Sequence, residues 1–171
     1  IANVAIGFEA LGKSTLTTAA SNVAVGYQAG IELTEGHSNV IVGKAAGDNI
    51  SSGDKNICIG LLAGDGVTTG SNNVFIGAGS PSAADVDASL VISDGNGDVT
   101  WISGLSNGNV GIGIAAPEES LHVEKDQNAY TRIKVKNDNA GSSAQAITNC
   151  ESDKGEFSVG ITSNTHSLGG A

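Results

Sequence analysis

Residues 1–79 alternate between a short apolar phrase and longer stretches of small and polar residues. The phrase is an asparagine, three apolar residues and a glycine. It occurs five times, at Asn3–Gly7, Asn22–Gly26, Asn39–Gly43, Asn56–Gly60 and Asn73–Gly77. Its asparagines therefore recur about every 17 residues, and a fixed period with one apolar segment per period predicts a stacked, solenoid-like fold.

Within each phrase the first and third apolar residues are two apart, so in a strand they share one face. Nearly all of them are β-branched, which favours strand over helix. The pairs are Val4 and Ile6, Val23 and Val25, Val40 and Val42, Ile57 and Ile59, and Val74 and Ile76. We expect them to be the inward residues. Two or three such residues per coil are too few for a separate core, which indicates that several chains share one core.

The polar and small positions of the repeat predict its corners. The glycine that closes each phrase fits a backbone turn with unusual dihedral angles or a close neighbour. The asparagine is expected to bond the local backbone or to stack on the asparagine of the next coil. A second glycine, at Gly36, Gly53 and Gly70, predicts another corner before the next strand.

Two phrases carry a resemblance to a known family. Asn-Val-Ala-Ile-Gly at Asn3–Gly7, with Ala-Gly following the later copies, resembles the trimeric left-handed parallel β-roll repeats of bacterial adhesin heads and phage tail fibres. Gly108–Pro117, followed by Glu119–Val123, resembles the segment that links such a roll to a more distal domain in tail fibres. The two together cover about two-thirds of the chain.

The resemblance implies a homotrimeric phage tail fibre, located in the virion and free of enzymatic activity and cofactors. Its implied partners are other copies of the chain, other tail or baseplate proteins, and a glycan or protein receptor on the host surface. A bacterial trimeric surface adhesin, whose heads use the same kind of roll, is the alternative that the resemblance leaves open. A monomeric solenoid binding protein is a third, from a different class.

The pattern divides the chain into three parts. Residues 1–79 are the β-roll repeats, and residues 80–117 are a hairpin and connector. Ser89–Ser93 and Val99–Ser103 predict the two strands of the hairpin, around a Gly-rich turn. Trp101, the only tryptophan, is expected against the base of the roll or at the axis of a trimer.

Residues 118–171 are predicted to be the N-terminal part of a distal β domain that continues beyond this sequence. The expected strands are Tyr130–Lys136, Ser143–Asn149 and Glu156–Thr162. Only Glu118–Lys125 has a charge pattern typical of a turn of helix. The whole chain is therefore predicted to be all-β.

Composition narrows the function. The chain has 25 glycines, 4% aromatic residues and no methionine, which argues against a compact enzyme with an aromatic core. Its net charge of −10 predicts that neither nucleic acid nor an anionic membrane is a partner. The sequence holds no apolar run of about 20 residues, so no membrane insertion is expected.

Gly7–Ser14 matches the phosphate-binding loop G-x-x-x-x-G-K-[ST] and follows a predicted strand. A working loop of this kind opens a helix, whose N-terminus meets the phosphates. Here another coil follows, and the glycines equivalent to Gly7 in the other coils lack the Lys-Ser pair. We therefore interpret the match as coincidence.

Other candidate chemistry is sparse, and no catalytic, cofactor or receptor-binding residue is assigned. Asp94, Asn96 and Asp98 fit the first three ligand positions of a calcium loop, but Val99 and Leu105 stand at the sixth and twelfth. We favour a polar hairpin turn and leave open an ion there or on a trimer axis. His37, His122 and His166 show no metal-ligand spacing. Cys58 and Cys150 are far apart in the sequence, and Cys58 is predicted to be a buried thiol.

Overall fold

The computed structural model describes residues 2–12, 18–79, 85–124, 133 and 136, and the backbone of 145–152 and 155–162. All the regular elements in this part of the chain are strands, which confirms the all-β class. The chain forms two compact units, Ile1–Asp126 (unit 1) and Gln127–Ala171 (unit 2).

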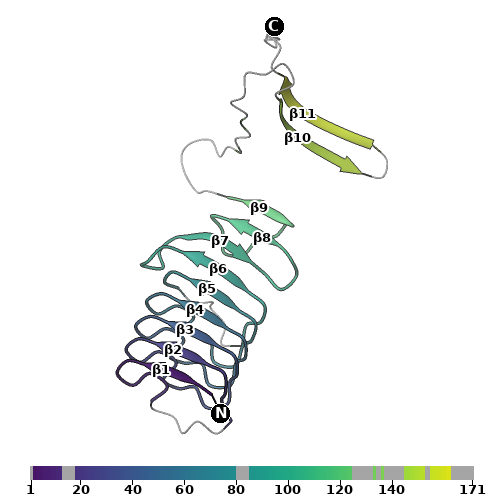
Figure 1. The fold of residues 1–171 in the computed structure, drawn as a ribbon. Helices are drawn as coiled ribbons and strands as arrows, with labels where there is room; N and C mark the ends of the chain where they lie inside the picture. The colour runs from purple at the N-terminus through teal and green to yellow at the C-terminus, as the bar shows by residue number, and fades with distance from the viewer. Residues whose placement is uncertain are drawn as a thin grey trace. The chain divides into compact units, whose positions relative to one another are not determined.

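Unit 1 is a β-solenoid whose strands stack as rungs in chain order (Figure 1). The repeat phrases form β1 to β5, which pair in parallel and in register, so the predicted period becomes one coil of the column. The nine strands are β1 Val4–Ile6, β2 Val23–Val25, β3 Val40–Val42, β4 Ile57–Ile59, β5 Val74–Ile76, β6 Leu90–Ser93, β7 Thr100–Gly104, β8 Val110–Ile112 and β9 Leu121–Val123.

After the repeats, one strand of the sheet, β7, runs in the direction opposite to all the others. β6 still pairs in parallel with β5, but β7 is antiparallel to both β6 and β8. The predicted hairpin is therefore confirmed, and its strands also continue the solenoid sheet. β9 returns to parallel pairing, with β8. The expected helical turn at Glu118–Lys125 is wrong, because Leu121–Val123 is a strand.

The interior of the coils is built from the middle residue of the second to fifth phrases. Ala24, Ile41, Cys58 and Phe75 are buried. Two further columns complete the interior from the other sides of the coil: Ala29, Ala46 and Ala63, and Leu33, Ile50 and Val67. Each coil therefore closes around apolar residues of its own.

The expectation that the flanking pairs are the inward residues of the coil is wrong. Because the middle residue of each three-residue strand points inward, its two neighbours must point outward. The burial of β4 shows this, with Cys58 buried between exposed Ile57 and Ile59. The core of a single coil and the apolar pairs thus lie on opposite faces of the sheet.

The asparagines form a buried ladder and also hold the corner, so both predicted roles are confirmed. The backbone N–H and side-chain Nδ2 of Asn39 donate to Oδ1 of Asn22, at 2.9 and 3.0 Å. Nδ2 of Asn39 also donates to the carbonyl of Gly53, at 2.8 Å. Asn73 donates in the same way to Oδ1 of Asn56, and the ladder ends where Ser89 N–H donates to Oδ1 of Asn73.

The glycine that closes each phrase is required by its backbone. Gly43 has φ of 140°, a region closed to ordinary side chains, and a methyl group there would overlap the carbonyl of Gly60 in the next coil. Gly26 and Gly60 are in the same situation. The predicted corner is confirmed.

Gly43→Ala is expected to lower the free energy of unfolding by at least about 1–3 kcal/mol, from backbone strain alone. Displacement of the next coil adds to this loss. Gly95→Ala is the control, because a methyl group at Gly95 meets no atom within 4 Å. Chemical denaturation should separate the two variants, and equal unfolding midpoints would contradict the tight stacking of coils at Gly43.

The described strands of unit 2 are β10 Gln145–Ser152 and β11 Gly155–Thr162. They pair antiparallel, with Asn149 opposite Ser158. The predicted second and third strands of the distal β domain are therefore confirmed, with small shifts of their ends. The predicted strand Tyr130–Lys136 lies outside the described residues, apart from Ile133 and Lys136.

Candidate functional site: an outward apolar face

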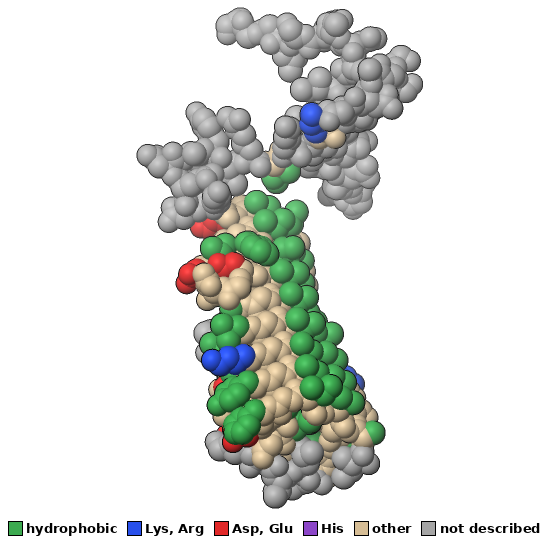
Figure 2. Space-filling model, turned by 60° about the vertical axis from the view of Figure 1, so that its left-hand side comes forward, with side chains coloured by type: hydrophobic (Ala, Val, Ile, Leu, Met, Phe, Trp, Pro, Cys, Tyr) green, Lys and Arg blue, Asp and Glu red, His purple; other side chains and the backbone are tan. Residues whose placement is uncertain are grey.

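The outward side chains of unit 1 form two apolar rows that cross all nine strands. We call them together the outward apolar face. The registers of the sheet place Val4, Val23, Val40, Ile57, Val74, Leu90, Val110 and Leu121 in one row, and Ile6, Val25, Val42, Ile59, Ile76, Ile92, Ile102, Ile112 and Val123 in the other. Gly104 on β7 is the single gap. Figure 2 shows hydrophobic side chains in a band along the length of the column.

About half of these side chains are exposed in one chain, and the others are half-buried. Ile6 is 60% exposed, Ile59 40% and Ile112 45%. Soluble monomers rarely leave contiguous apolar patches larger than a few hundred Å² in water, and larger ones mark interaction sites. Neither row contains a polar side chain. The face is therefore the candidate interface.

The outward apolar face continues where the interior of the solenoid ends. Along the inward row, Phe75 of β5 is followed by Val91, Ser103, Gly111 and His122 on β6 to β9. From β7 on, the inward residues are thus small or polar, while the outward residues stay apolar even across the reversed strand β7. Core packing does not explain that choice of residues, whereas contact with another surface does.

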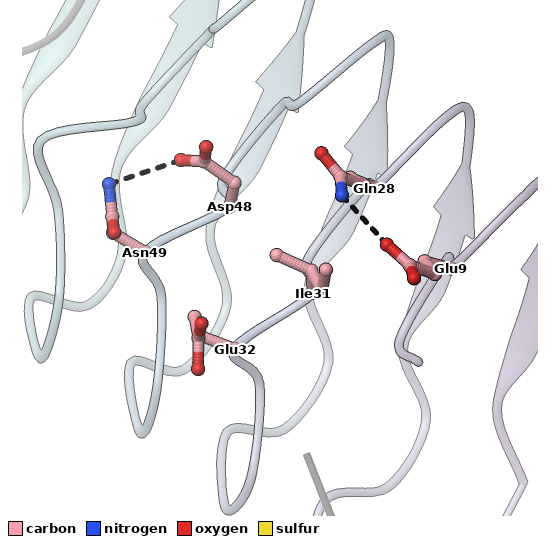
Figure 3. Close-up of a pocket in the computed structure, with 6 residues that line it drawn as sticks. All are labelled: Glu9, Gln28, Ile31, Glu32, Asp48 and Asn49. Carbon is pink, nitrogen blue, oxygen red and sulfur yellow. Dashed lines mark hydrogen bonds between the residues drawn. The ribbon is translucent and has the colours of Figure 1, made fainter. Parts of the chain in front are cut away.

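A second surface feature is a shallow acidic groove of about 550 Å³ on the side of the coils (Figure 3). Burial raises the pKa of Asp48, and the nearby charges of Asp65 and Glu32 act in the same direction. Polar groups in the groove bond one another: Gln28 Nε2 donates to Glu9 at 2.7 Å, and Asn49 Nδ2 donates to Asp48 at 3.2 Å. The groove is lined by Glu9, Gln28, Ile31, Glu32, Asp48 and Asn49.

The phosphate-loop match begins at a structural glycine. Gly7 has φ of 133° and occupies the same corner as Gly26 in the next coil. The interpretation of Gly7 as a corner residue is confirmed. Lys13 and Ser14, the residues that would contact phosphate, lie outside the described residues.

Asp94, Asn96 and Asp98 lie in the turn between β6 and β7, as expected for a polar hairpin turn. Asp94 closes the turn: its N–H donates to the Val99 carbonyl at 3.0 Å, and its Oδ1 accepts from Val99 N–H at 3.3 Å. Asn96 and Asp98 are exposed. Among the residues that the structure describes, no group of three or more His, Cys, Asp or Glu side chains is placed to hold a metal ion.

The described histidines lie apart, each beside an acid. His37 Nδ1 is 3.5 Å from Asp54 Oδ1, and His122 Nε2 is 3.5 Å from Glu124 Oε2. These are separate surface pairs on different coils. His166 lies outside the described residues.

Cys58 is a fully buried free thiol, as predicted, and burial raises its pKa to about 12. The side chain of Cys150 lies outside the described part.

In a Cys150→Ser background, we expect folded protein to resist thiol reagents from pH 7 to 9, because the thiolate is the reactive form. Because the unfolded thiol ionises first, near its ordinary pKa of 9.0, this group lowers stability as pH rises above that value. Rapid labelling of the folded variant at pH 8 would contradict the burial.

Comparisons of the chain with models of known protein families, with curated protein sequences and with solved structures gave no significant match. Within the described residues, no helix has the length and apolar character needed to cross a bilayer. The candidate interface therefore rests on the geometry of unit 1.

Proposed function

We propose that this chain is a structural, non-enzymatic segment of a homotrimeric phage tail fibre. Unit 1 acts as a stiff spacer, and the part of the fibre beyond it presents a tip that binds a receptor on the host surface. The observation that carries the proposal is the outward apolar face, which runs along all nine strands and is only half-buried to exposed in one chain.

The shape of the face favours a ring of chains. Each repeat strand has only three residues, so the sheet is about 10 Å wide and long in the stacking direction. Three such narrow faces turned toward a common axis cover one another along the whole column. A closed rotational ring also prevents open-ended growth. The likeness of Asn3–Gly7 and its repeats to trimeric rolls supports three as the number of chains.

The role of spacer follows from the bonding along the column. Successive coils are joined by strand ladders and by the buried asparagine ladder. Each coil adds about 4.8 Å to the length, since that is the spacing of neighbouring strands. Bending the stack of coils would break hydrogen bonds in several of these ladders at once. The stack is therefore suitable as a rigid arm.

The assignment to a phage fibre, and not to a bacterial surface adhesin, depends on the phrase Gly108–Pro117, which resembles tail-fibre connectors. Antibodies against residues 18–79 test it by immuno-electron microscopy of the culture that produces the protein. Gold on the fibres of released particles is the expected result. Gold over the cell envelope would contradict the phage assignment and favour the adhesin.

A monomeric solenoid binding protein remains the second candidate, because each coil has a closed interior. Phe75, Ile41 and Leu33 are fully buried without help from another chain. In that case the outward apolar face would be covered by a different protein. The mass of the protein in solution separates the two candidates.

A further inference from the structure

The outward apolar face has a notch at Gly104. This glycine lies between Leu90 on β6 and Val110 on β8, at the one position of its row without a side chain. The gap opens into a groove of about 280 Å³. The groove is lined by Asn72, Val74, Ala88, Ser89, Leu90, Gly104, Leu105, Gly108, Asn109 and Val110. Most of these residues begin a strand or precede one, so the notch lies at the edge of the face where β5, β6 and β8 start.

Trp101 lies at the opposite edge of the same sheet. Its carbonyl accepts a hydrogen bond at 3.1 Å from the N–H of Gly113, the residue that follows β8. Trp101 is 55% exposed and is the only tryptophan in the chain. An exposed indole is costly in water, and tryptophan is among the residue types most enriched in the energetic centres of protein interfaces.

A shift in strand register sets the direction of Trp101. Ile92 pairs with Ile102 and Ser93 pairs with Thr100, so Trp101 is the extra residue of a β-bulge between β6 and β7. A bulge interrupts the strict alternation of faces and re-aims the side chain that it carries. Trp101 is accordingly exposed, whereas Ser103 on the inward side is buried.

Trp101 does not fill the notch of its own chain. Three residue steps separate Trp101 from Gly104, which is about 10 Å along an extended strand. The two residues therefore mark the two ends of β7, one with an exposed aromatic residue and the other without a side chain.

A rotational ring of copies brings these two edges together. In a ring, each chain presents one edge of its face to the opposite edge of the next chain, which is a heterologous contact. Rotation about an axis parallel to the column leaves the height of every residue unchanged. Because Trp101 and Gly104 lie on the same strand, they meet at one level, and each ring has as many indoles as notches.

We propose that in the assembled fibre the Trp101 side chain of each chain inserts into the Gly104 notch of its neighbour. This contact fixes the rotational and axial register of the chains where the solenoid ends. The inference rests on the proposed homotrimer, and it names the side chain and the pocket through which neighbouring copies lock.

Fluorescence of the full chain tests the contact, since Trp101 is the only source of indole emission. In the parent protein we expect a blue-shifted Trp101 emission and weak quenching by iodide. Gly104→Leu fills the notch and should shift the emission to the red and increase quenching several-fold. Gly95→Leu, in the exposed turn beside β6, is the control and should leave both unchanged. A blue-shifted emission that Gly104→Leu does not alter overturns the contact.

Cross-linking provides a second measurement, which does not depend on how Gly104→Leu folds. In a Cys150→Ser background, Trp101→Cys combined with Leu105→Cys should give covalently closed trimers on mild oxidation. Either single substitution should give far fewer cross-linked chains. Absence of cross-links in the double variant would overturn the proposal.

The result is separable from the proposed function. If light scattering gives a trimer while Trp101 is freely quenched in the parent protein, the contact is wrong and the trimeric fibre stands. If the protein is a monomer, both are wrong.

Discussion

Ile59→Asp is expected to convert the assembly into monomers while each coil remains folded. Ile59 lies in the middle of the outward apolar face and is 40% exposed in a single chain. Full burial of such a side chain contributes about 1.5–3 kcal/mol, assembly supplies the fraction that belongs to its exposed part, and a trimer loses that fraction three times. The substitution also places three like charges close to a common axis and away from water, which adds a large desolvation cost. Light scattering should give a mass near 16.9 kDa instead of three times that value.

Leu62→Asp is the matched control. Leu62 is also 40% exposed but lies in the turn after β4, off the outward apolar face. Its φ of 55° is a conformation that aspartate tolerates better than most residues, so its coil should not be strained. The control should keep the mass of the parent protein. If both variants dissociate, or neither does, the assignment of the interface to this face is contradicted.

Asn56→Ala is expected to lower the free energy of unfolding by at least about 3 kcal/mol, because it leaves several buried groups unsatisfied. Oδ1 of Asn56 accepts from the N–H and Nδ2 of Asn73, both at 3.0 Å. Nδ2 of Asn56 donates to the carbonyl of Gly70 at 2.9 Å. Alanine leaves these groups without those partners inside the column, and each unsatisfied buried group costs about 1–3 kcal/mol.

Chemical denaturation at a fixed protein concentration measures this loss, since the stability of an oligomer depends on concentration. Asn96→Ala is the control, because Asn96 is exposed in the turn between β6 and β7. A loss below about 1 kcal/mol for Asn56→Ala would show that the ladder is not a structural element of the column.

The repeat phrase predicted the solenoid and the role of its polar residues. The spacing of Asn22, Asn39, Asn56 and Asn73 places one asparagine per coil, and a parallel stack of equal coils can only bring them into a column. The corner glycines could be predicted in the same way, from their regular spacing. Both follow from local backbone geometry, which is why the sequence alone was sufficient.

The sequence did not reveal which face of the strand is the inside. All three residues of Val40–Val42 are apolar, so the alternation that normally separates inside from outside is missing. Two further signals were present. The middle position varies in size from Ala24 to Phe75, as filling a coil interior requires, and Leu33, Ile50 and Val67 recur with the period of the repeat as an independent apolar column.

The candidate interface could be predicted only in part. The apolar pairs were visible in the sequence, and the expectation of a shared core came from the small number of inward residues expected per coil. The notch at Gly104 was not visible in the sequence. It depends on the register of β6, β7 and β8, in which Leu90, Gly104 and Val110 fall in one row. The predicted hairpin implied the reversal of β7, but the register shift within it and the pairing of β7 with β8 are not indicated by any repeat in the sequence.

The central claim is that copies of this chain cover one another's outward apolar faces. Light scattering of the full chain after size exclusion tests it most directly. We expect a single species of three times 16.9 kDa, about 51 kDa, which does not dissociate on dilution. A compact, stable species of 16.9 kDa would contradict it, because the outward apolar face would then be open to water in the native protein.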